Sequence, residues 1–341
     1  MELEQKGIQI IQETAPPVSL QWPLKLADGL KDPGYHGISA FVDHNPNYPD
    51  MLLDYNCGTR SYDLDSGYNH RGTDFFTWPF SWHKMDDNEV LVVAAAPGTI
   101  IGRSDGNLDR NCGFGDDNWN AVYVQHSDGS VAWYGHLKEN SVTSKQVGDP
   151  VSAGEYLGVV GSSGNSSGPH LHFELQDDQY NTQDDQYNTI DPYAGLCNQI
   201  VSWWEDQRPY YDSAINALKT HSATPDFYSC PQPASKNEQN QFEPGDTIYF
   251  YTYYRDQLAG QESQYTIFQP DGTVYYQRTD ASSAPHWIAS YFGWSINFPQ
   301  DVMQGIWKFQ VIYEGVTYTH YFFMGNFGNI APALILLLNN E

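Results

Sequence analysis

Short apolar runs alternate with turn signals between Val90 and Leu175. The runs are rich in β-branched and aromatic residues, and PG, SDG, GD and SGNSSG separate them. They are VLVVAA, GTIIG, AVYVQH, VAWYGHL, LGVVG and HLHFEL. The gaps leave no room for crossover helices of about ten or more residues, so the pattern predicts an antiparallel sheet and not a parallel α/β sheet.

A second series of β-type runs begins at Phe242. The runs TIYFYTYY, QYTIFQ, TVYYQRT, SYFGWSINF, WKFQVIY and THYFFMG recur with turn residues such as PDG between them. About seven short strands over about 85 residues are typical of an immunoglobulin-like β-sandwich. We therefore expect an all-β chain with a smaller sandwich after the first antiparallel domain.

The remaining segments are interpreted from their composition. Residues 1–61 are rich in Pro, Asp, Asn and Gly, and we expect an irregular segment that wraps the following domain, 62–196. Residues 201–221 are the one stretch with a helical character, within a linker over 197–232. A sandwich domain over 233–330 and a hydrophobic tail over 331–341 complete the expected organisation.

Two further segments have no expected chemistry. The heptapeptide QDDQYNT occurs twice in succession between Gln176 and Thr189, which we interpret as a duplication in a surface loop. The apolar run from Ala333 to Leu338 is far shorter than the roughly 20 residues of a transmembrane helix. No transmembrane segment is expected.

The charge balance limits the partners. Lys and Arg number 16 against 42 Asp and Glu, which gives a formal charge of -26 and repels polyanions such as nucleic acid. The first residues, MELEQKG, lack the basic and apolar regions of a signal peptide, and we interpret the sequence as a mature chain with an added Met.

The cysteines indicate an oxidising compartment. They form no CxxC pair, and their even number fits disulfide bonds in an exported protein. Of the three possible pairings, nearest-neighbour pairing joins Cys57 to Cys112 and Cys197 to Cys230, and this is the one we expect.

Candidate metal ligands occur in three short motifs of the first domain. In NHRGTDF, His70 and Asp74 are four residues apart. In HLHFEL, His170 and His172 are two residues apart, so a strand places both imidazoles on one face. His136 ends the run VAWYGHL and can reach the same face. Two histidines and an aspartate leave one tetrahedral position for water, as in catalytic zinc sites. The spacing leaves open whether His170 or His172 is a ligand.

These motifs resemble those of a known family. NHRGTDF, VAAAPGTIIG, VQHSDGSVAWYGHL, VGDPVSAGEYLGVVGSSG and SGPHLHFEL together are similar to the catalytic domain of lysostaphin-like zinc metalloendopeptidases, which have the duplicated hybrid motif fold. The resemblance covers residues 62–193. It implies one zinc ion bound by His70, Asp74 and His172, with His136 and His170 as catalytic residues. It also implies a tyrosine hydroxyl that stabilises the transition state, and Tyr62 or Tyr68 could supply it.

The resemblance further implies a secreted or periplasmic enzyme that cleaves stem or cross-bridge peptides of bacterial peptidoglycan. Two alternatives remain: an extracellular endopeptidase acting on glycine-rich proteins such as elastin, and a catalytically inactive regulator that binds the cell wall. The inactive regulators usually lack one or more ligands, whereas all five expected residues are present here.

One segment departs from the family pattern. Between Asp74 and Val90 the sequence FFTWPFSWHKMDDNE is longer and more aromatic than the family core requires. It could form a hydrophobic cap on the sandwich. Alternatively, its aromatic residues form the wall of a substrate groove. These residues are Phe76, Trp78, Phe80 and Trp82.

Overall fold

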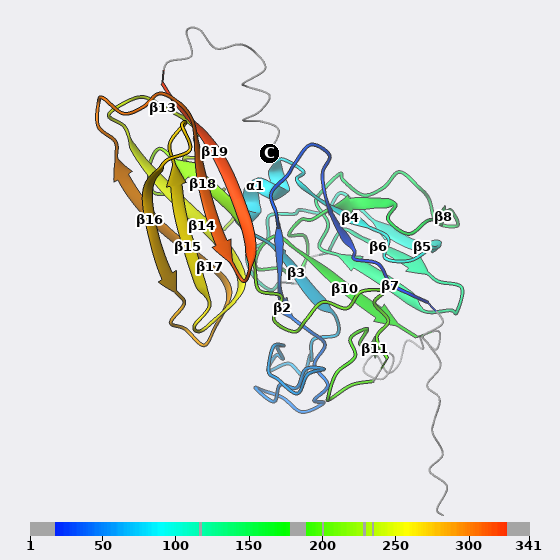
Figure 1. Cartoon of the computed structure of the whole chain (residues 1–341). Coiled ribbons are helices and arrows are strands. Elements are labelled where there is room, and N and C mark those ends of the chain that lie inside the picture. Colours follow the sequence, from blue (N-terminus) through cyan, green and yellow to red (C-terminus); the bar gives the residue numbers. More distant parts are fainter. Residues whose placement is uncertain are drawn as a thin grey trace, which may run out of the picture.

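The computed structural model describes residues 18–115, 118–177, 189–199, 201–227, 230–233 and 235–325. The repeated heptapeptide, apart from its ends, and the expected C-terminal tail lie outside the described residues. Two β-rich units stand side by side (Figure 1). The first unit contains β1 to β11, and the second contains β12 to β19.

The main sheet of the first unit has eight strands. Its order is β2-β3-β10-β7-β6-β5-β8, with β11 beside β10. All of its pairings are antiparallel, as the short gaps between the runs predicted. The strands are β2 His36–Ala40, β3 Thr73–Thr77, β5 Gly98–Ser104, β6 Ala121–Gln125, β7 Val131–Gly135, β8 Pro150–Val151, β10 His170–Gln176 and β11 Thr189–Ile190.

A smaller antiparallel sheet completes the first unit. It has the order β1-β4-β9 and consists of β1 Leu24–Leu26, β4 Val90–Val93 and β9 Tyr156–Val159. Apolar side chains of both sheets form one core, which includes Phe75, Val92, Tyr134 and Phe173. The only helix among the described residues is α1, Ser81–Asp86, and none there could span a bilayer. The all-β prediction is confirmed.

The second unit consists of two sheets around a common core. The order in one sheet is β12-β14-β17 and in the other β13-β19-β18-β15-β16. The strands are β12 Ala214–His221, β13 Gln241–Phe242, β14 Thr247–Leu258, β15 Glu262–Phe268, β16 Val274–Ala281, β17 His286–Asn297, β18 Gly305–Tyr313 and β19 Val316–Met324. Ile248 and Phe250 of one sheet pack with Trp307 and Phe309 of the other. The immunoglobulin-like type of this sandwich stays a prediction.

Three expectations are corrected by the structure. The helix expected over 201–221 is absent among the described residues there, because β12 pairs with β14 along the second half of that stretch. Pairing and burial override the helix propensity of SAINALK, and Pro209 interrupts any helix before it. The N-terminal segment is not wholly irregular, because it supplies β1 and β2 to the two sheets.

The disulfide pairing is also corrected. Cys57 is bonded to Cys197, and Cys112 to Cys230. Sequence proximity does not decide the pairing, because tertiary contacts bring distant loops together. The backbone N–H of Cys197 donates to the carbonyl of Tyr55 at 2.8 Å, and Arg110 donates to the carbonyl of Pro231 at 2.8 Å.

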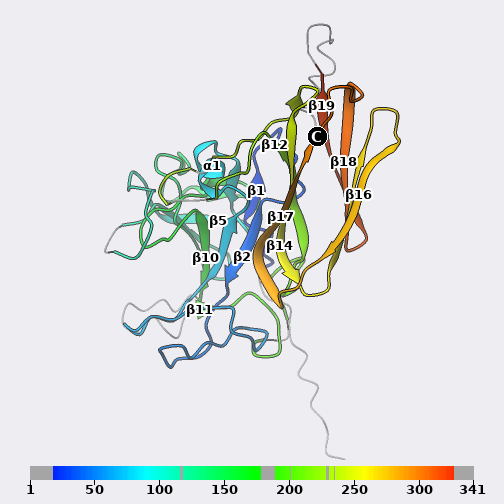
Figure 2. The same ribbon diagram turned by 90° about the vertical axis from the view of Figure 1, so that its left-hand side faces the viewer.

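The two units are joined by a packed junction. Figure 2 shows the sheet β12-β14-β17 between the first unit and the five-stranded sheet. The amide nitrogen of Asn216 donates to the carbonyls of His36 and Trp78 at 2.9 and 3.0 Å. Arg60 and Asp256 form an ion pair at 2.7 Å whose side chains are only 6% and 2% exposed. The second unit is therefore fixed against the first, not tethered by a loose linker.

Candidate metal centre and substrate cleft

Neighbouring strands of the main sheet bring the predicted ligands together. His172 on β10 lies opposite Asp74 on β3 in the antiparallel register. His70 precedes β3, and its Nε2 atom lies 3.2 Å from Asp74 Oδ1. Nδ1 of His172 lies 2.9 Å from the same oxygen and 3.2 Å from Nε2 of His70. All three side chains are buried.

In His70 and His172, the hydrogen bond made by the ring nitrogen that points away from the cluster determines which nitrogen faces it. Nδ1 of His70 lies 2.8 Å from the carbonyl of Phe41 and can only donate to it, so Nε2 keeps its lone pair. Nε2 of His172 lies 3.2 Å from the carboxylate of Glu174 and donates there, so Nδ1 keeps its lone pair. Three lone-pair atoms thus converge on one point, an arrangement that a cation stabilises.

Steric contacts with β10 leave room only for glycine at position 72. A Cβ atom at Gly72 would lie 2.6 Å from the carbonyl oxygen of Phe173 and 2.7 Å from Cε1 of His172. Any side chain there would displace the imidazole of His172. The sequence spacing suggested a tight bend at this residue, but the close approach of β10 is what demands glycine.

The carboxylates give the cluster a negative potential. Burial opposes ionisation of Asp74, but the imidazoles of His70, His170 and His172 hold the pKa of its carboxyl well below the usual range. Burial likewise opposes a charge on His172, yet Asp74 and Glu174 raise the pKa of its imidazole to about 10. Without a metal, Nδ1 of His172 therefore carries a proton toward Asp74, and a cation at the cluster would take the place of that proton. A site that holds positive charge this strongly suits a divalent cation.

His136 and His170 lie beside the cluster. Their ring centroids are 4.4 Å apart, and Nε2 of His170 lies 3.7 Å from Asp74 Oδ1. Nδ1 of His136 donates to the carbonyl of Ser163 at 2.6 Å, and Nδ1 of His170 donates to that of Gly168 at 2.8 Å. Burial lowers the pKa of both imidazoles, well below the usual range for His136. Both rings are therefore neutral, with a free lone pair on Nε2.

The two candidate tyrosines lie next to the ligands. The ring of Tyr62 stacks on His70 with centroids 4.4 Å apart, and the ring of Tyr68 lies 6.2 Å from that of Tyr62. Burial, reinforced by Asp74 and Glu174, raises the pKa of both phenols. Both hydroxyls stay protonated and can donate hydrogen bonds. The structure brings both tyrosines close to the cluster.

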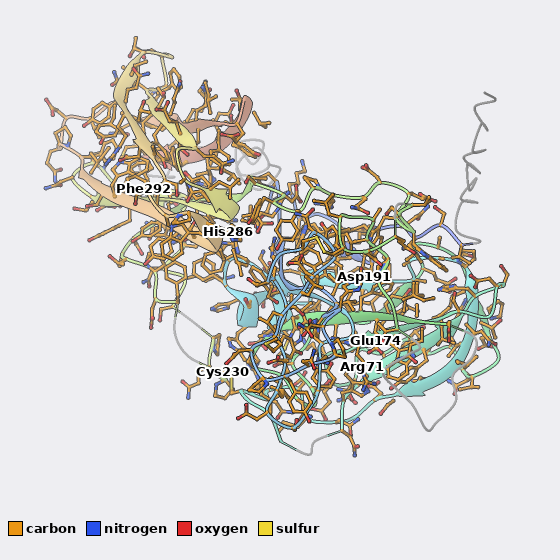
Figure 3. All side chains as sticks on the ribbon, turned by 90° about the horizontal axis from the view of Figure 1, so that it is seen from below. Arg71, Glu174, Asp191, Cys230, His286 and Phe292 are labelled. Atoms are coloured by element: carbon orange, nitrogen blue, oxygen red, sulfur yellow. A yellow bond between two sulfur atoms is a disulfide. The ribbon has the colours of Figure 1, made fainter. Side chains whose placement is uncertain are left out.

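The cluster lies where two cavities meet. The cavity that we call the aromatic arm has a volume of about 720 Å³ and is lined by Asp74, His170 and several aromatic residues. The polar arm, of about 760 Å³, is lined by His136, His172, Glu174 and Arg71 among others. Figure 3 labels Arg71 and Glu174, which lie together in the first unit. The residues that line both arms are Tyr62, Leu64, Phe114 and Asn165.

The aromatic segment between Asp74 and Val90, which contains α1, both packs on the sandwich and lines the cleft, the two arrangements considered from the sequence. The residues predicted as a groove wall all line the aromatic arm: Phe76, Trp78, Phe80 and Trp82. Phe80 is only 7% exposed and stacks on Phe227 with centroids 5.4 Å apart. It also packs on Tyr253 of β14. The segment therefore packs on the sandwich while one side of it faces the cleft.

Sequence reasoning missed several residues of the site. Glu174 continues the alternation of His170 and His172 on β10, so its place on the same face was readable from the pattern. Trp119 packs edge-on against His136 with centroids 5.0 Å apart, and Phe227 comes from the second unit. No sequence signal identifies Trp119 or Phe227, because only the tertiary fold brings them to the cleft.

Comparison with known proteins identifies the class of this domain. Residues 69–187 match peptidase family M23. The resemblance to lysostaphin-like peptidases is therefore confirmed over this part of the chain.

Individual relatives match the same region. The cell division protein DipM of Caulobacter vibrioides is 36% identical over 90 residues, which are 26% of this chain and 14% of that protein. The DD-carboxypeptidase/endopeptidase Mpg of Neisseria meningitidis is 42% identical over 85 residues, 25% of this chain and 17% of that protein. The match thus spans less than a fifth of the length of either relative.

A solved structure matches as well. The catalytic domain of lysostaphin from Staphylococcus simulans has 28% sequence identity and a TM-score of 0.28, over 39% of this chain and 83% of that one.

Proposed function

We propose that the chain is a zinc-dependent metalloendopeptidase that hydrolyses peptide bonds of bacterial peptidoglycan. The observation that carries the proposal is the convergence of three lone-pair atoms, from His70, Asp74 and His172, next to two further neutral imidazoles. Metal ligands alone would also fit a structural site. The additional His136 and His170 supply the groups that move protons during hydrolysis.

The donor set fits zinc. Ligands about 2.0–2.1 Å from a tetrahedral zinc ion lie about 3.3–3.4 Å from one another. The three donor atoms here are separated by 2.9–3.2 Å, close to that spacing. Both imidazoles have their second nitrogen fixed by an acceptor, as zinc-binding histidines usually do. A zinc ion held at such a site would polarise a carbonyl group as a Lewis acid and would lower the pKa of its water to about 7.

The surrounding residues supply the remaining steps. Nε2 of His170 or of His136 takes the proton from the attacking water, and the same pair returns a proton to the leaving amine. The hydroxyl of Tyr62 or Tyr68 donates a hydrogen bond to the oxyanion that develops on the carbonyl oxygen. Burial of both imidazoles favours the neutral, proton-accepting form that this role requires.

The shape of the cleft supports cleavage within a chain. Two arms meet at the metal cluster, so a substrate can extend on both sides of the bond that is cut. Peptidoglycan peptides are proposed as the substrate because relatives of the domain include a protein of Vibrio cholerae named peptidoglycan DD-endopeptidase ShyC. The two disulfides support an exported, secreted or periplasmic enzyme.

The test combines metal analysis with digestion. We expect one zinc ion per chain by elemental mass spectrometry, and peptide fragments from purified peptidoglycan but not from elastin. His172→Ala should lose both, whereas His83→Ala, which removes an imidazole of α1 outside the lining of either arm, should keep both. Zinc binding without turnover of any peptidoglycan type would favour the inactive regulator, and turnover of elastin alone would favour the alternative protease.

A further inference from the structure

A third cavity lies on the second unit. We call it the sandwich groove; its volume is about 430 Å³, and it is lined by residues of β16 and β17 and the segment between them. These two strands are the edge strands of the two sheets. The lining includes Phe292, which Figure 3 labels on the second unit.

The sandwich groove adjoins the aromatic arm of the cleft. Trp78 lines both cavities. Phe227 lines the aromatic arm and stacks on Tyr291 of the sandwich groove, with centroids 4.5 Å apart and planes 22° from parallel. Because Asn216 ties β12 to the carbonyl of Trp78, the two cavities keep a fixed relation.

The lining of the sandwich groove suits a neutral ligand with many hydroxyl groups. Trp287 and Tyr291 lie on one face of β17 and are each 51% exposed. Ser283 and Ser290, whose side chains carry hydroxyl groups, are among the residues that line the same cavity. Exposed aromatic rings flanked by such groups can stack on the C–H face of a sugar ring while the hydroxyls bond to its polar edge.

The charges near the groove also favour a neutral ligand. Its described lining includes no Lys or Arg, and its one carboxylate, Asp280, is paired with Arg278. The guanidinium of Arg278 lies 4.7 Å from the centroid of the Phe292 ring, but it is paired with Asp280. The lining therefore offers no uncompensated charge to an ionic ligand and suits an uncharged polyhydroxylated chain.

We propose that the sandwich groove binds the glycan strand of the substrate polymer while an attached peptide enters the aromatic arm. This inference rests on the proposed function for the identity of the polymer. In peptidoglycan the peptides branch from a chain of neutral N-acetylated sugars, so a glycan site beside a peptide cleft matches the connectivity of the polymer. The second unit then presents the peptide to the metal centre, because both cavities are rigidly joined.

The test measures sugar binding separately from hydrolysis. The full chain is titrated with a hexamer of β-1,4-linked N-acetylglucosamine by isothermal calorimetry. Trp287→Ala and Tyr291→Ala should each weaken binding roughly tenfold, as loss of a central aromatic contact does. Trp287→Phe should keep most of the affinity. Val316→Ala, which truncates a side chain that is 51% exposed in the same unit but lies outside the groove, should bind as the wild type does.

Activity provides the second measurement. Trp287→Ala should raise the KM for polymeric peptidoglycan several-fold and leave kcat/KM for a short sugar-free stem peptide unchanged. Unaltered hexamer binding in both alanine variants overturns the proposal, as does absence of hexamer binding by the wild type. An equal loss on the sugar-free peptide also overturns it, because the groove is then a peptide site. Hexamer binding that depends on Trp287 supports it even if no peptide bond is cleaved, which would contradict only the proposed function.

Discussion

The carboxylate of Glu174 lies 3.2 Å from Nε2 of His172, on the opposite side of the imidazole from the metal cluster. Gln176 donates to the other carboxylate oxygen of Glu174, so the carboxylate is itself held in place. The contact between Glu174 and Nε2 fixes the orientation of the His172 ring and turns its Nδ1 toward the cluster. In the proposed metal site Glu174 is therefore a positioning residue that acts through His172, not a ligand.

Replacing Glu174 with Gln should weaken zinc binding about 10- to 100-fold, as loss of a partner behind a metal-binding histidine usually does. The amide keeps the shape of the side chain but loses the negative charge that makes the His172 imidazole a stronger electron-pair donor to a metal. Competition with a chromophoric chelator measures the affinity directly and does not depend on turnover. Glu262→Gln, at an exposed position of β15, is the control and should bind zinc normally. Equal affinities for the wild type and Glu174→Gln would contradict the assigned role.

His136→Gln should separate metal binding from catalysis. His136 lies beside the cluster but contributes none of its three converging atoms. We expect the zinc content to stay at the wild-type value while kcat falls about 10²- to 10⁴-fold, the usual contribution of a general acid or base. Zinc analysis and kinetics with a stem peptide on the same preparation provide the comparison. Loss of the metal in this variant would show that His136 is a ligand after all.

Much of this site was predictable because its signal is local. His170, His172 and Glu174 alternate along one strand, and the period of two alone places them on one face. The choice of His172 as the metal ligand was not predictable from spacing, because His170 lies on the same face. The register favours His172, which lies opposite Asp74, whereas His170 lies opposite Phe76.

The failures of prediction concern long-range structure. The helix expected near SAINALK became β12 because Ala217 and its neighbours pair with β14 and pack at the junction of the units. The disulfides join residues 140 and 118 positions apart, and no sequence rule specifies which loops meet. Phe227 reaches the cleft only because the second unit is fixed against the first. These features depend on packing energy summed over distant residues.

The disulfide between Cys112 and Cys230 should support both stability and substrate binding. It anchors the loop that carries Phe114, a residue lining both arms, to the segment between β12 and β13 of the second unit. The double variant Cys112→Ser/Cys230→Ser should lose about 2–5 kcal/mol of unfolding free energy. We also expect a raised KM with little change in zinc content. Urea denaturation and stem-peptide kinetics test this, and peptide mapping without reduction tests the pairing. Fragments joining Cys57 to Cys112 would contradict the structure.

The stability of the junction should depend on pH through His221. Nδ1 of His221 donates to the carbonyl of Lys236 at 2.7 Å, and Nε2 accepts from the hydroxyl of Tyr253 at 3.0 Å. Burial lowers the pKa of this imidazole to about 4, whereas an unfolded histidine has a pKa of about 6.5. Between these values the unfolded chain binds more protons than the folded one. The contribution is therefore complete above about pH 6.5 and is lost as the pH falls toward 4.

The matched variant is His221→Gln, whose amide can also donate to Lys236 and accept from Tyr253. The unfolding free energy of the wild type should fall by up to about 1.4 kcal/mol per pH unit more steeply than that of the variant between pH 6.5 and 4. His320, whose pKa burial lowers to about 3, should contribute to both proteins equally. Urea titrations at several pH values measure the difference in slope. Parallel curves would show that His221 does not couple protonation to the junction.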